Sequence, residues 1–449
     1  MNKLYSMLPI FLQNIALSIY GYKLKKIRYS KHFYERLKFL EKSLYWSEDE
    51  LTHYQEKQLQ KLIKYVYSNI PYYREVMMNL NLKPSDFNTL EDLKKLPILT
   101  KKDIITNYQK LINPKIKEKY SFVKTSGSSG TPLSIMITDK AVAYEYANTW
   151  RQRNLFNIHL KDKLATFNGR MIIDPDSNSK ILWRRNYTFN QTLFSLAHLK
   201  KENIPYIVNE FNKTKYDYIN GYPSTLEYIA NIILEKNLQI NSQIKRIFTS
   251  SETLNDNAKK VIEKAFRTKI SDRYSSAERV CSFMQYNDDL YYHNSEDGFI
   301  ELLEHNTGYK KIICTGFNNY AMPLIRYDIG DLVDDNIHIK KSFNRLVVSK
   351  IIGREDDVIF TPDGRVNGRL DHIFKGLKEI NRCQIIQEDL NTVIFKIETT
   401  FNFTQKQKVL LLKNAEERLG KMKFIIETVD EIPLSKNGKF KAVINKVKI

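Results

Sequence analysis

Glycines and small hydroxylated residues are concentrated in the stretch TSGSSGTP, which spans residues 125–132. Glycine tolerates positive φ and has no Cβ, so this backbone can curl and present several N–H groups to an anion, and the hydroxyls add donors. The same composition is typical of a flexible linker. The alternating apolar and polar residues at 133–138 predict a half-buried strand directly after the stretch, which would hold it as a cradle for phosphates.

Polar groups recur where predicted strands end: GYPS at 221–224, SSE at 250–252 and YSSAE at 274–278. The last of these places an aromatic ring and a carboxylate four residues apart. Each motif alone is read as a turn, but open α/β sheets bind ligands at successive strand ends. The recurrence therefore favours a ligand site along one edge of a sheet, with Tyr222 and Pro223 either lining a carboxylate pocket or packing the core.

Further downstream stand three charged motifs: PLIRYDIGD at 323–331, IIGREDDVI at 351–359 and PLSKNGK at 433–439. They supply Asp331, Arg354, Asp356 and Lys439. Asn-Gly is a strong turn signal, so the last motif by itself is an ordinary surface turn. Only the combination with the upstream motifs gives Lys439 a chemical role.

Hydrophobic periodicity predicts how these motifs are positioned. Helices are expected at 51–77 up to the break at Pro71, 90–108 with a turn around Pro97, 139–153, 204–211, 224–236 and 257–266. Strands are expected at 164–167, 171–173, 216–219, 244–249 and 270–274. The alternation predicts an α/β fold whose sheet is largely parallel and joined by helical crossovers.

The C-terminal part is predicted to be a small α+β lid that begins near residue 355. A hairpin turn is expected at 362–364, helices at 371–377 and 405–419, and strands at 384–387, 393–397 and 423–429. We therefore expect a large domain of mixed and parallel sheets at 1–354, with a helical part at 1–120, and a small domain at 355–449.

Composition sets the class of protein and excludes some kinds of site. The 449 residues are 42% hydrophobic and 12% aromatic, which is typical of a globular chain of two or three domains. The net charge of +20 favours anionic ligands or surfaces, although much of the excess can be solvated lysine. Cys281, Cys314 and Cys383 are widely spaced, which argues against a disulfide framework or a cysteine zinc site and suits a reducing compartment.

An apolar segment at 7–22 is too short to cross a bilayer and lacks a signal-peptide cleavage pattern. Basic residues follow it directly, at positions 23, 25, 26, 28 and 31. Two alternatives stay open: an interfacial helix on an anionic membrane, or a helix docked on the core. We expect a cytoplasmic protein with a possible peripheral contact at the inner face of the membrane.

The ordered set TSGSSGTP, YSSAE, RYDIGD, GREDD and PLSKNGK resembles the adenylate-forming enzymes, which include acyl-CoA synthetases, peptide-synthetase adenylation domains and luciferases. Within them the sequence is similar to the phenylacetate-CoA ligase branch and its relatives associated with capsular polysaccharide. The resemblance runs from about residue 121 to the end of the chain. It implies a large domain followed by a small mobile lid, and ATP- and Mg²⁺-dependent activation of a small carboxylic acid.

The resemblance also implies roles for individual residues. The glycine-rich stretch would hold the β- and γ-phosphates, Tyr274 would stack on adenine, and Asp331 would bind the ribose hydroxyls. Glu278 would hold Mg²⁺, Asp356 would be the hinge, and Lys439, Glu278 and Arg354 would be catalytic. The full set implied to bind the nucleotide is Thr125, Ser126, Gly127, Ser128, Ser129, Gly130, Thr131, Ser251, Glu252, Tyr274, Ser275, Ser276, Asp331 and Arg354.

Some residues depart from the pattern of the branch. Ser250-Ser251-Glu252 replaces Gly-Ala-Glu, Ser275 replaces a glycine, and the stretch 364–370 lacks the Val-Phe-Pro that follows the hinge in phenylacetate-CoA ligases. Coenzyme A is therefore a doubtful acceptor, and the acyl group could pass to another thiol or to an amine on a small molecule, carrier protein or glycan precursor. The alternatives are a phenylacetate-CoA-ligase-like enzyme, an inactive scaffold, and a basic nucleic-acid-binding protein, for which no RNA- or DNA-binding motif is present.

Overall fold

The computed structural model describes residues 3–124, 133–174, 177, 179–305, 308–334, 337–340, 343–354, 359–362, 366–367, 370–374, 377, 380–399, 403–433 and 440–447. The chain forms two compact units, each assembled from segments that are distant in sequence. The first unit comprises Met1–Gly21, Ile158–Asp272 and Ile352–Ile449, and the second comprises Tyr22–Asn157 and Arg273–Ile351.

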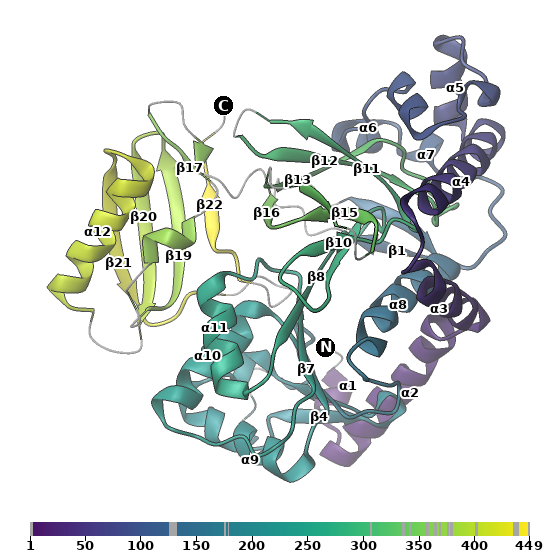
Figure 1. The fold of residues 1–449 in the computed structure, drawn as a ribbon. Helices are drawn as coiled ribbons and strands as arrows, with labels where there is room; N and C mark the ends of the chain where they lie inside the picture. Colours follow the sequence, from purple (N-terminus) through teal and green to yellow (C-terminus); the bar gives the residue numbers. More distant parts are fainter. Residues whose placement is uncertain are drawn as a thin grey trace. The chain divides into compact units, whose positions relative to one another are not determined.

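The first unit contains an α/β layer built on parallel strands (Figure 1). Its elements are α1 (Lys3–Ser6), the first part of α2 (Ile10–Arg28), β3 (Leu164–Phe167), β4 (Trp183–Asn186), β5 (Gln191–Phe194), α9 (Ile204–Thr214), β6 (Tyr218–Gly221), α10 (Pro223–Glu235), β7 (Arg246–Ser250), α11 (Asp256–Phe266) and the start of β8 (Ile270–Ser275). Short 3₁₀ helices lie at Tyr187–Phe189, Leu196–His198 and Lys201–Asn203.

Strands β7, β6, β3 and β5 are neighbours in that order and run parallel, while β4 closes the edge antiparallel to β5. Their apolar residues and those of α9, α10 and α11 share one buried core that includes Phe167, Ile219 and Ile247. The predicted alternation of strands and helices is thereby confirmed in this region. Parallel pairing brings the ends of β6 and β7 to the same edge of the sheet, which is where the GYPS and SSE motifs follow them.

One predicted strand is wrong, because residues 171–173 adopt no regular structure. Ile172 and Ile173 are buried beside Leu193 of β5 and Leu17 of α2. Their apolar character reflects this packing of a loop against the sheet and a helix rather than strand pairing.

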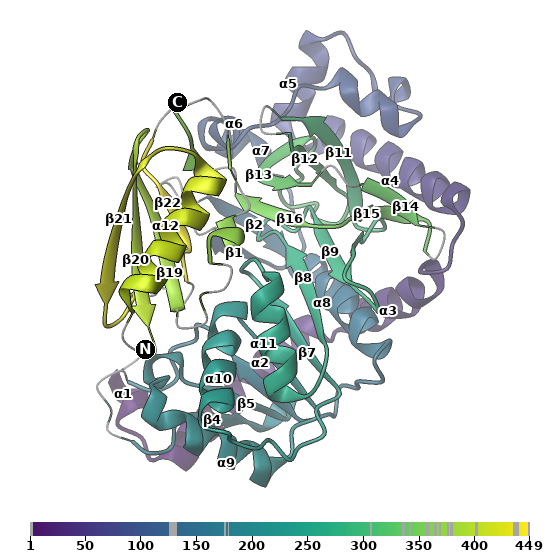
Figure 2. The same ribbon diagram turned by 60° about the vertical axis from the view of Figure 1, so that its left-hand side comes forward.

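The C-terminal part of the first unit is a four-stranded sheet with a helix against it (Figure 2). After β16 (Ile351–Arg354) come β17 (Ile359–Phe360), β18 (Val366–Asn367), a 3₁₀ helix (Leu370–Phe374), β19 (Ile380–Asp389), β20 (Thr392–Thr399), α12 (Gln405–Leu419), β21 (Lys423–Val429) and β22 (Val443–Asn445). The strand order is β21-β20-β19-β22. The predicted hairpin is confirmed by the pairing of Phe360 with Val366.

The second unit begins with helices and ends with antiparallel sheets. Its helices are α3 (Lys31–Ser43), α4 (Glu48–Asn69), α5 (Pro71–Asn79), α6 (Lys101–Thr106), α7 (Tyr108–Leu111) and α8 (Asp139–Asn154), with 3₁₀ turns at Pro84–Asp86 and Leu90–Lys95. Its strands are β1 (Tyr120–Lys124), β2 (Ser134–Thr138), β9 (Ser282–Gln285), β10 (Tyr291–His293), β11 (Gly298–Glu304), β12 (Lys310–Gly316), β13 (Tyr327–Val333), β14 (Ile337–Lys340) and β15 (Arg345–Val348).

The glycine-rich stretch connects two paired strands of this unit. β1 and β2 are antiparallel, with Lys124 opposite Ser134. The strand predicted directly after the stretch is therefore confirmed as β2, and its residues Ile135 and Ile137 are buried in the core of the unit. Residues 125–132 themselves lie outside the described residues.

Candidate functional site

Tyr274 and Asp331, which the resemblance assigns to adenine and ribose, contact each other directly in the second unit. The Tyr274 hydroxyl donates a hydrogen bond to Oδ2 of Asp331. Tyr274 lies near the end of β8, opposite Phe283 of β9, and their ring centroids are 6.1 Å apart. Burial and the nearby Asp331 carboxylate raise the pKa of Tyr274 well above its usual value, so its hydroxyl stays protonated and acts as the donor.

The backbone of β13 turns so that the Asp331 side chain is buried. Gly330 has φ of +73°, a left-handed conformation that favours glycine. Its N–H donates to Oδ1 of Asp328 at 3.0 Å, which stabilises this local bend. The pairing of β12 with β13 also shifts register between Lys311 and Ile313, as expected for a bulge near a functional side chain.

Glu278, the expected Mg²⁺ ligand, belongs to the same cluster. Its carboxylate is buried, and Oε1 accepts a long hydrogen bond of 3.4 Å from the hydroxyl of Tyr327 on β13. A tight turn carries Glu278, in which the Ser276 N–H donates to the carbonyl of Cys281 at 3.1 Å. The same strand therefore supplies both Tyr327 beside Glu278 and, four residues later, Asp331 beside Tyr274.

A second group of expected site residues lies in the first unit, around Glu252. Oε2 of Glu252 accepts from the backbone N–H of Ser224 at 3.1 Å, and Oε1 accepts from the backbone N–H of Phe440 at 3.0 Å. Ser224 is in the first turn of α10, where unpaired N–H groups favour an anion. Phe440 directly follows Lys439 in the chain.

The turn that carries Glu252 is conformationally unusual. Ser251 has φ of +74°, which is uncommon for a residue other than glycine, asparagine or aspartate. Such conformations cost about 1–3 kcal/mol and cluster at functional sites. Ser251 was expected to bind the nucleotide, and its geometry is a reason to keep that prediction.

Tyr222 and Pro223, the expected pocket residues, begin α10 beside this turn. The Tyr222 N–H donates to the carbonyl of Phe167 at 3.2 Å, and burial raises the pKa of its hydroxyl. Pro223 is buried and Tyr222 is partly exposed. Tyr222 alone of the two is therefore accessible to a ligand in this unit.

Some of the predicted site residues fall outside the part of the chain that the structure describes. Residues 125–131, Asp356 and Lys439 lie outside the described residues, and Arg354 ends β16 with a side chain that is also outside them. Ser275, the last residue of β8, is exposed, and Ser276 after it is partly exposed. The described site residues thus form two groups, one in each unit.

Sequence reasoning missed three residues that support these groups. Tyr327 contacts Glu278 through its side-chain hydroxyl and lies within the RYDIGD motif, whereas Phe440 contacts Glu252 only through its backbone N–H, which has no side-chain signal. Arg326, within RYDIGD, forms a bidentate pair with Glu301 at 2.9 and 2.8 Å and has φ of +51°. The arginine of that motif therefore fixes the chain directly before β13.

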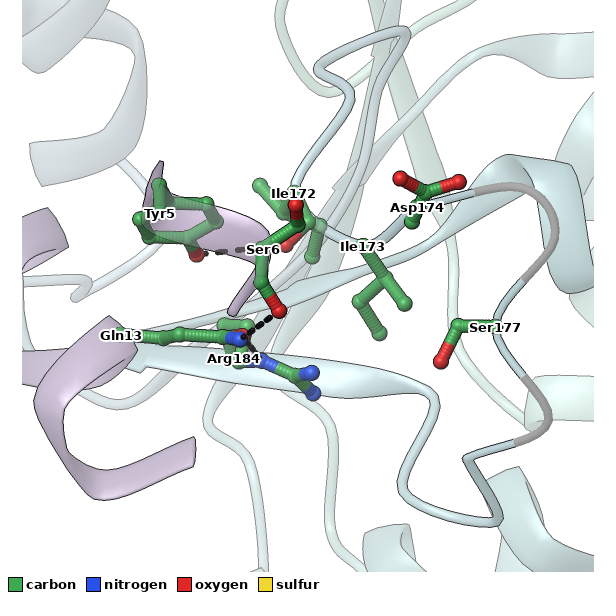
Figure 3. A pocket seen from close by; sticks show the side chains of 8 residues that line it. All are labelled: Tyr5, Ser6, Gln13, Ile172, Ile173, Asp174, Ser177 and Arg184. Atoms are coloured by element: carbon green, nitrogen blue, oxygen red, sulfur yellow. Dashed lines mark hydrogen bonds between the residues drawn. The ribbon is translucent and has the colours of Figure 1, made fainter. Parts of the chain in front are cut away.

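A separate pocket of about 330 Å³ lies in the first unit and contains none of the predicted site residues (Figure 3). Its lining comes from α1, α2, β4 and the loop after β3, namely Tyr5, Ser6, Gln13, Ile172, Ile173, Asp174, Ser177 and Arg184. In Figure 3 Gln13 reaches toward Arg184, whose Nε donates to Oε1 of Gln13. This contact joins α2 to β4.

Among the described residues, no three His, Cys, Asp or Glu side chains come together as a metal cluster. Mg²⁺ is usually held by only one or two carboxylates together with substrate phosphates. A single buried carboxylate such as Glu278 fits that coordination.

Comparison with known proteins supports the resemblance. A family profile described as the CapK C-terminal domain matches residues 359–446. Over its whole length the chain is 27% identical to protein CapK of Staphylococcus aureus, with all of both chains covered. It is also 32% identical over 85 residues to a phenylacetate-coenzyme A ligase of Thermus thermophilus, which covers 19% of each chain.

A crystal structure of 2-hydroxyisobutyryl-CoA ligase in the postadenylation state, in complex with 2-HIB-AMP, has a TM-score of 0.70 to this chain. The two are 17% identical, and the match covers 90% of this chain and 92% of the other, which establishes a shared fold. The predicted fold class is thereby confirmed. This chain therefore shares its fold with 2-hydroxyisobutyryl-CoA ligase and is similar in sequence to protein CapK over its whole length.

Proposed function

We propose that this chain uses ATP to activate a carboxylic acid as an acyl-adenylate, releasing pyrophosphate, and then passes the acyl group to a thiol or an amine. The observation that carries the proposal is the cluster of Tyr274, Asp331 and Glu278. It combines an aromatic ring, an acceptor for hydroxyl groups and a buried carboxylate. These are the groups needed to hold a base, a sugar and a cation.

The chemistry explains the need for a cation near the phosphates. Attack of a carboxylate on the α-phosphate brings negative charges together, and preorganised positive charge lowers that barrier. Mg²⁺, when bound through Glu278, would supply charge at the phosphates, and Lys439 would supply it beside the reacting carboxylate. No general base is needed, because the attacking carboxylate is already ionised at neutral pH.

The similarity to CapK supports a role in capsular or surface polysaccharide synthesis. In that setting the acid would be an amino acid, a hydroxy acid or a sugar uronate. The second candidate is an acyl-CoA synthetase of the phenylacetate-CoA ligase kind, favoured by the local similarity to that enzyme. The two differ only in the second half-reaction, so coenzyme A dependence separates them.

ATP–pyrophosphate exchange with a panel of acids tests the first half-reaction. We expect exchange with one class of acid, and its loss in Glu278→Gln. Glu304→Gln is the matched control, because Glu304 is an exposed carboxylate at the end of β11. The exchange rate of this control variant should be unchanged. ATP binding without exchange across the whole panel would favour an inactive scaffold. Nucleic-acid binding with a steep salt dependence and no ATP binding would favour the remaining alternative.

Lys439 provides a second test. Lys439→Ala should slow the exchange reaction by about two to four orders of magnitude, by analogy with the loss of a preorganised donor. ATP affinity should change much less, because this lysine is proposed to act on the reacting groups. An unchanged exchange rate would leave PLSKNGK as the surface turn that its Asn-Gly signal indicates.

A further inference from the structure

Helix α2 buries polar residues on its inward face, where Leu17 also packs, and exposes several of its large apolar residues. Helices at a protein surface normally bury an apolar stripe and expose their polar face. The buried residues of α2 are instead Gln13, Asn14 and Gly21. This reversal leaves an apolar helix face without a covering element among the described residues.

Specific hydrogen bonds fix this orientation about the helix axis. The backbone N–H of Arg185 donates to Oδ1 of Asn14 at 2.8 Å, and the N–H of Tyr187 donates to Oγ of Ser18 at 2.9 Å. Gly21 is also required here, because a Cβ at this position would lie 2.5 Å from Oδ1 of Asn186. The polar face of α2 is thus joined to β4 and the turn after it, and the helix cannot rotate to bury its apolar side.

The outward apolar face consists of residues at helical spacing. The exposed fraction of the residue is 62% for Phe11, 45% for Ile15, 57% for Ile19 and 56% for Tyr22. Intervals of four, four and three residues place them on one stripe of the helix. Met7 precedes them and is 82% exposed. A contiguous apolar stripe of this kind indicates an interaction surface rather than scattered surface residues.

The charges around the stripe indicate which partner it fits. Residues 1–34 contain no aspartate or glutamate. Lys23, Lys25 and Lys26 are exposed in the last turns of α2, and a 100° step per residue places Lys23 and Lys25 on opposite sides of the stripe. If the partner were the same face of a second copy, this segment would bring only lysines and no carboxylate to pair with them. Anionic lipid headgroups, in contrast, would complement the lysines.

We propose that the outward apolar face of α2, with Met7, docks on the surface of an anionic lipid bilayer. The helix lies in the plane of the interface, with Phe11, Ile15 and Ile19 in the acyl boundary and the lysines at the headgroups. In the described part of the chain no helix is long and apolar enough to span a membrane, which fits a helix that lies on the surface.

Sedimentation of the full chain with vesicles tests this proposal. We expect binding to phosphatidylcholine vesicles that contain phosphatidylglycerol, and little binding to phosphatidylcholine alone. Phe11→Ser combined with Ile15→Ser should weaken binding by about tenfold or more, because two buried apolar side chains are lost. Lys25→Gln combined with Lys26→Gln should weaken it by about fivefold for each lysine, and added salt should reproduce that loss.

The control variant is Met78→Ser, which changes an exposed apolar residue of α5 and should bind vesicles like the unaltered chain. The altered side chains are all exposed, so the thermal unfolding midpoint should stay constant and a folding defect can be recognised. Absence of vesicle binding, or equal binding to neutral and anionic vesicles, overturns the proposal. So does a lipid-free dimer that Phe11→Ser with Ile15→Ser converts to a monomer, because the face would then be covered by a second copy.

Discussion

The backbone N–H of Phe440 donates a hydrogen bond to Oε1 of Glu252 at 3.0 Å, directly after Lys439 in the chain. The other oxygen of the same carboxylate accepts from the N–H of Ser224 in the first turn of α10. Glu252 therefore joins Phe440, the residue that follows the PLSKNGK motif, to the first turn of α10. From this contact we predict a positioning role for Glu252, in addition to the nucleotide binding that the resemblance implies.

Glu252→Ala should lower the kcat of ATP–pyrophosphate exchange by about ten- to a hundredfold, because hydrogen bonds to a charged acceptor contribute about 1.5–3 kcal/mol. Glu252→Gln retains an oxygen that can accept from Phe440, so it should restore most of the rate. The KM for ATP should stay nearly constant in both variants. A raised KM with an unchanged kcat would instead place Glu252 at the nucleotide.

Tyr274 allows stacking and hydrogen bonding to be separated. Tyr274→Ala should weaken ATP binding by about tenfold or more, because stacking of a base on an aromatic ring contributes about 1–3 kcal/mol. Tyr274→Phe keeps the ring and removes only the donor to Asp331, so its loss of affinity should be smaller. Titration calorimetry with ATP measures both variants. Equal losses would show that the hydroxyl, not the ring, matters.

Glu227 should make stability depend on pH in an unusual direction. Burial raises its pKa to about 7, while Asn257 and Arg382 partly oppose the rise. Between the unfolded value near 4.5 and about 7 the folded chain binds more protons than the unfolded chain, so stability falls as pH rises through this range.

The matching experiment is urea unfolding of Glu227→Gln at pH 5 and pH 8.5. At the lower pH the variant should resemble the unaltered chain, because Glu227 is already neutral. At the higher pH it should be more stable by about 2 kcal/mol, since it avoids a poorly solvated charge. Glu416→Gln, an exposed carboxylate on α12, should show no such dependence on pH. The same difference in unfolding free energy between variant and unaltered chain at both pH values would contradict the raised pKa of Glu227.

Glu296 is the centre of a buried ionic network in the second unit. It accepts hydrogen bonds from Arg151 at 2.8 Å and from both terminal nitrogens of Arg345 at 2.7 and 2.6 Å. Glu296→Ala would leave two buried arginines without their shared partner, so we expect a loss of about 3–5 kcal/mol in unfolding free energy. Glu75→Ala breaks the exposed pair with Lys110 and should cost under about 1 kcal/mol.

The same network makes the stability of the fold depend on pH in the acid range. Despite the opposing effect of burial, Arg151 and Arg345 hold the pKa of Glu296 well below its usual value. The contribution of Glu296 to stability is therefore present above a pH of about 4.5 and is lost as the pH falls below it. When unfolding at acid pH is followed by circular dichroism, the stability of Glu296→Gln should depend less on pH than the stability of the unaltered chain.

Local sequence signals determined most elements of the fold. Helix α12 and strand β21 occupy the residues predicted for them, because Thr404 and Gln407 form a capping box and Gly420 ends the helix. Tyr274, Glu278 and Asp331 were also predicted, since their order along the chain resembles a known set of motifs. Capping, periodicity and motif order are properties of neighbouring residues, and they can be read without a structure.

The tertiary structure decided contacts between distant residues and the exposure of each face. Arg151 and Glu296 are 145 residues apart, and the contact of Glu252 with Phe440 spans 188 residues and uses a backbone N–H. Ile172 and Ile173 looked like a strand but pack in a loop. For α2 the sequence left two alternatives open, an interfacial helix and a helix docked on the core. The hydrogen bond from the Arg185 N–H of β4 to Asn14 holds a polar face of α2 inward, because buried polar groups are nearly always hydrogen-bonded.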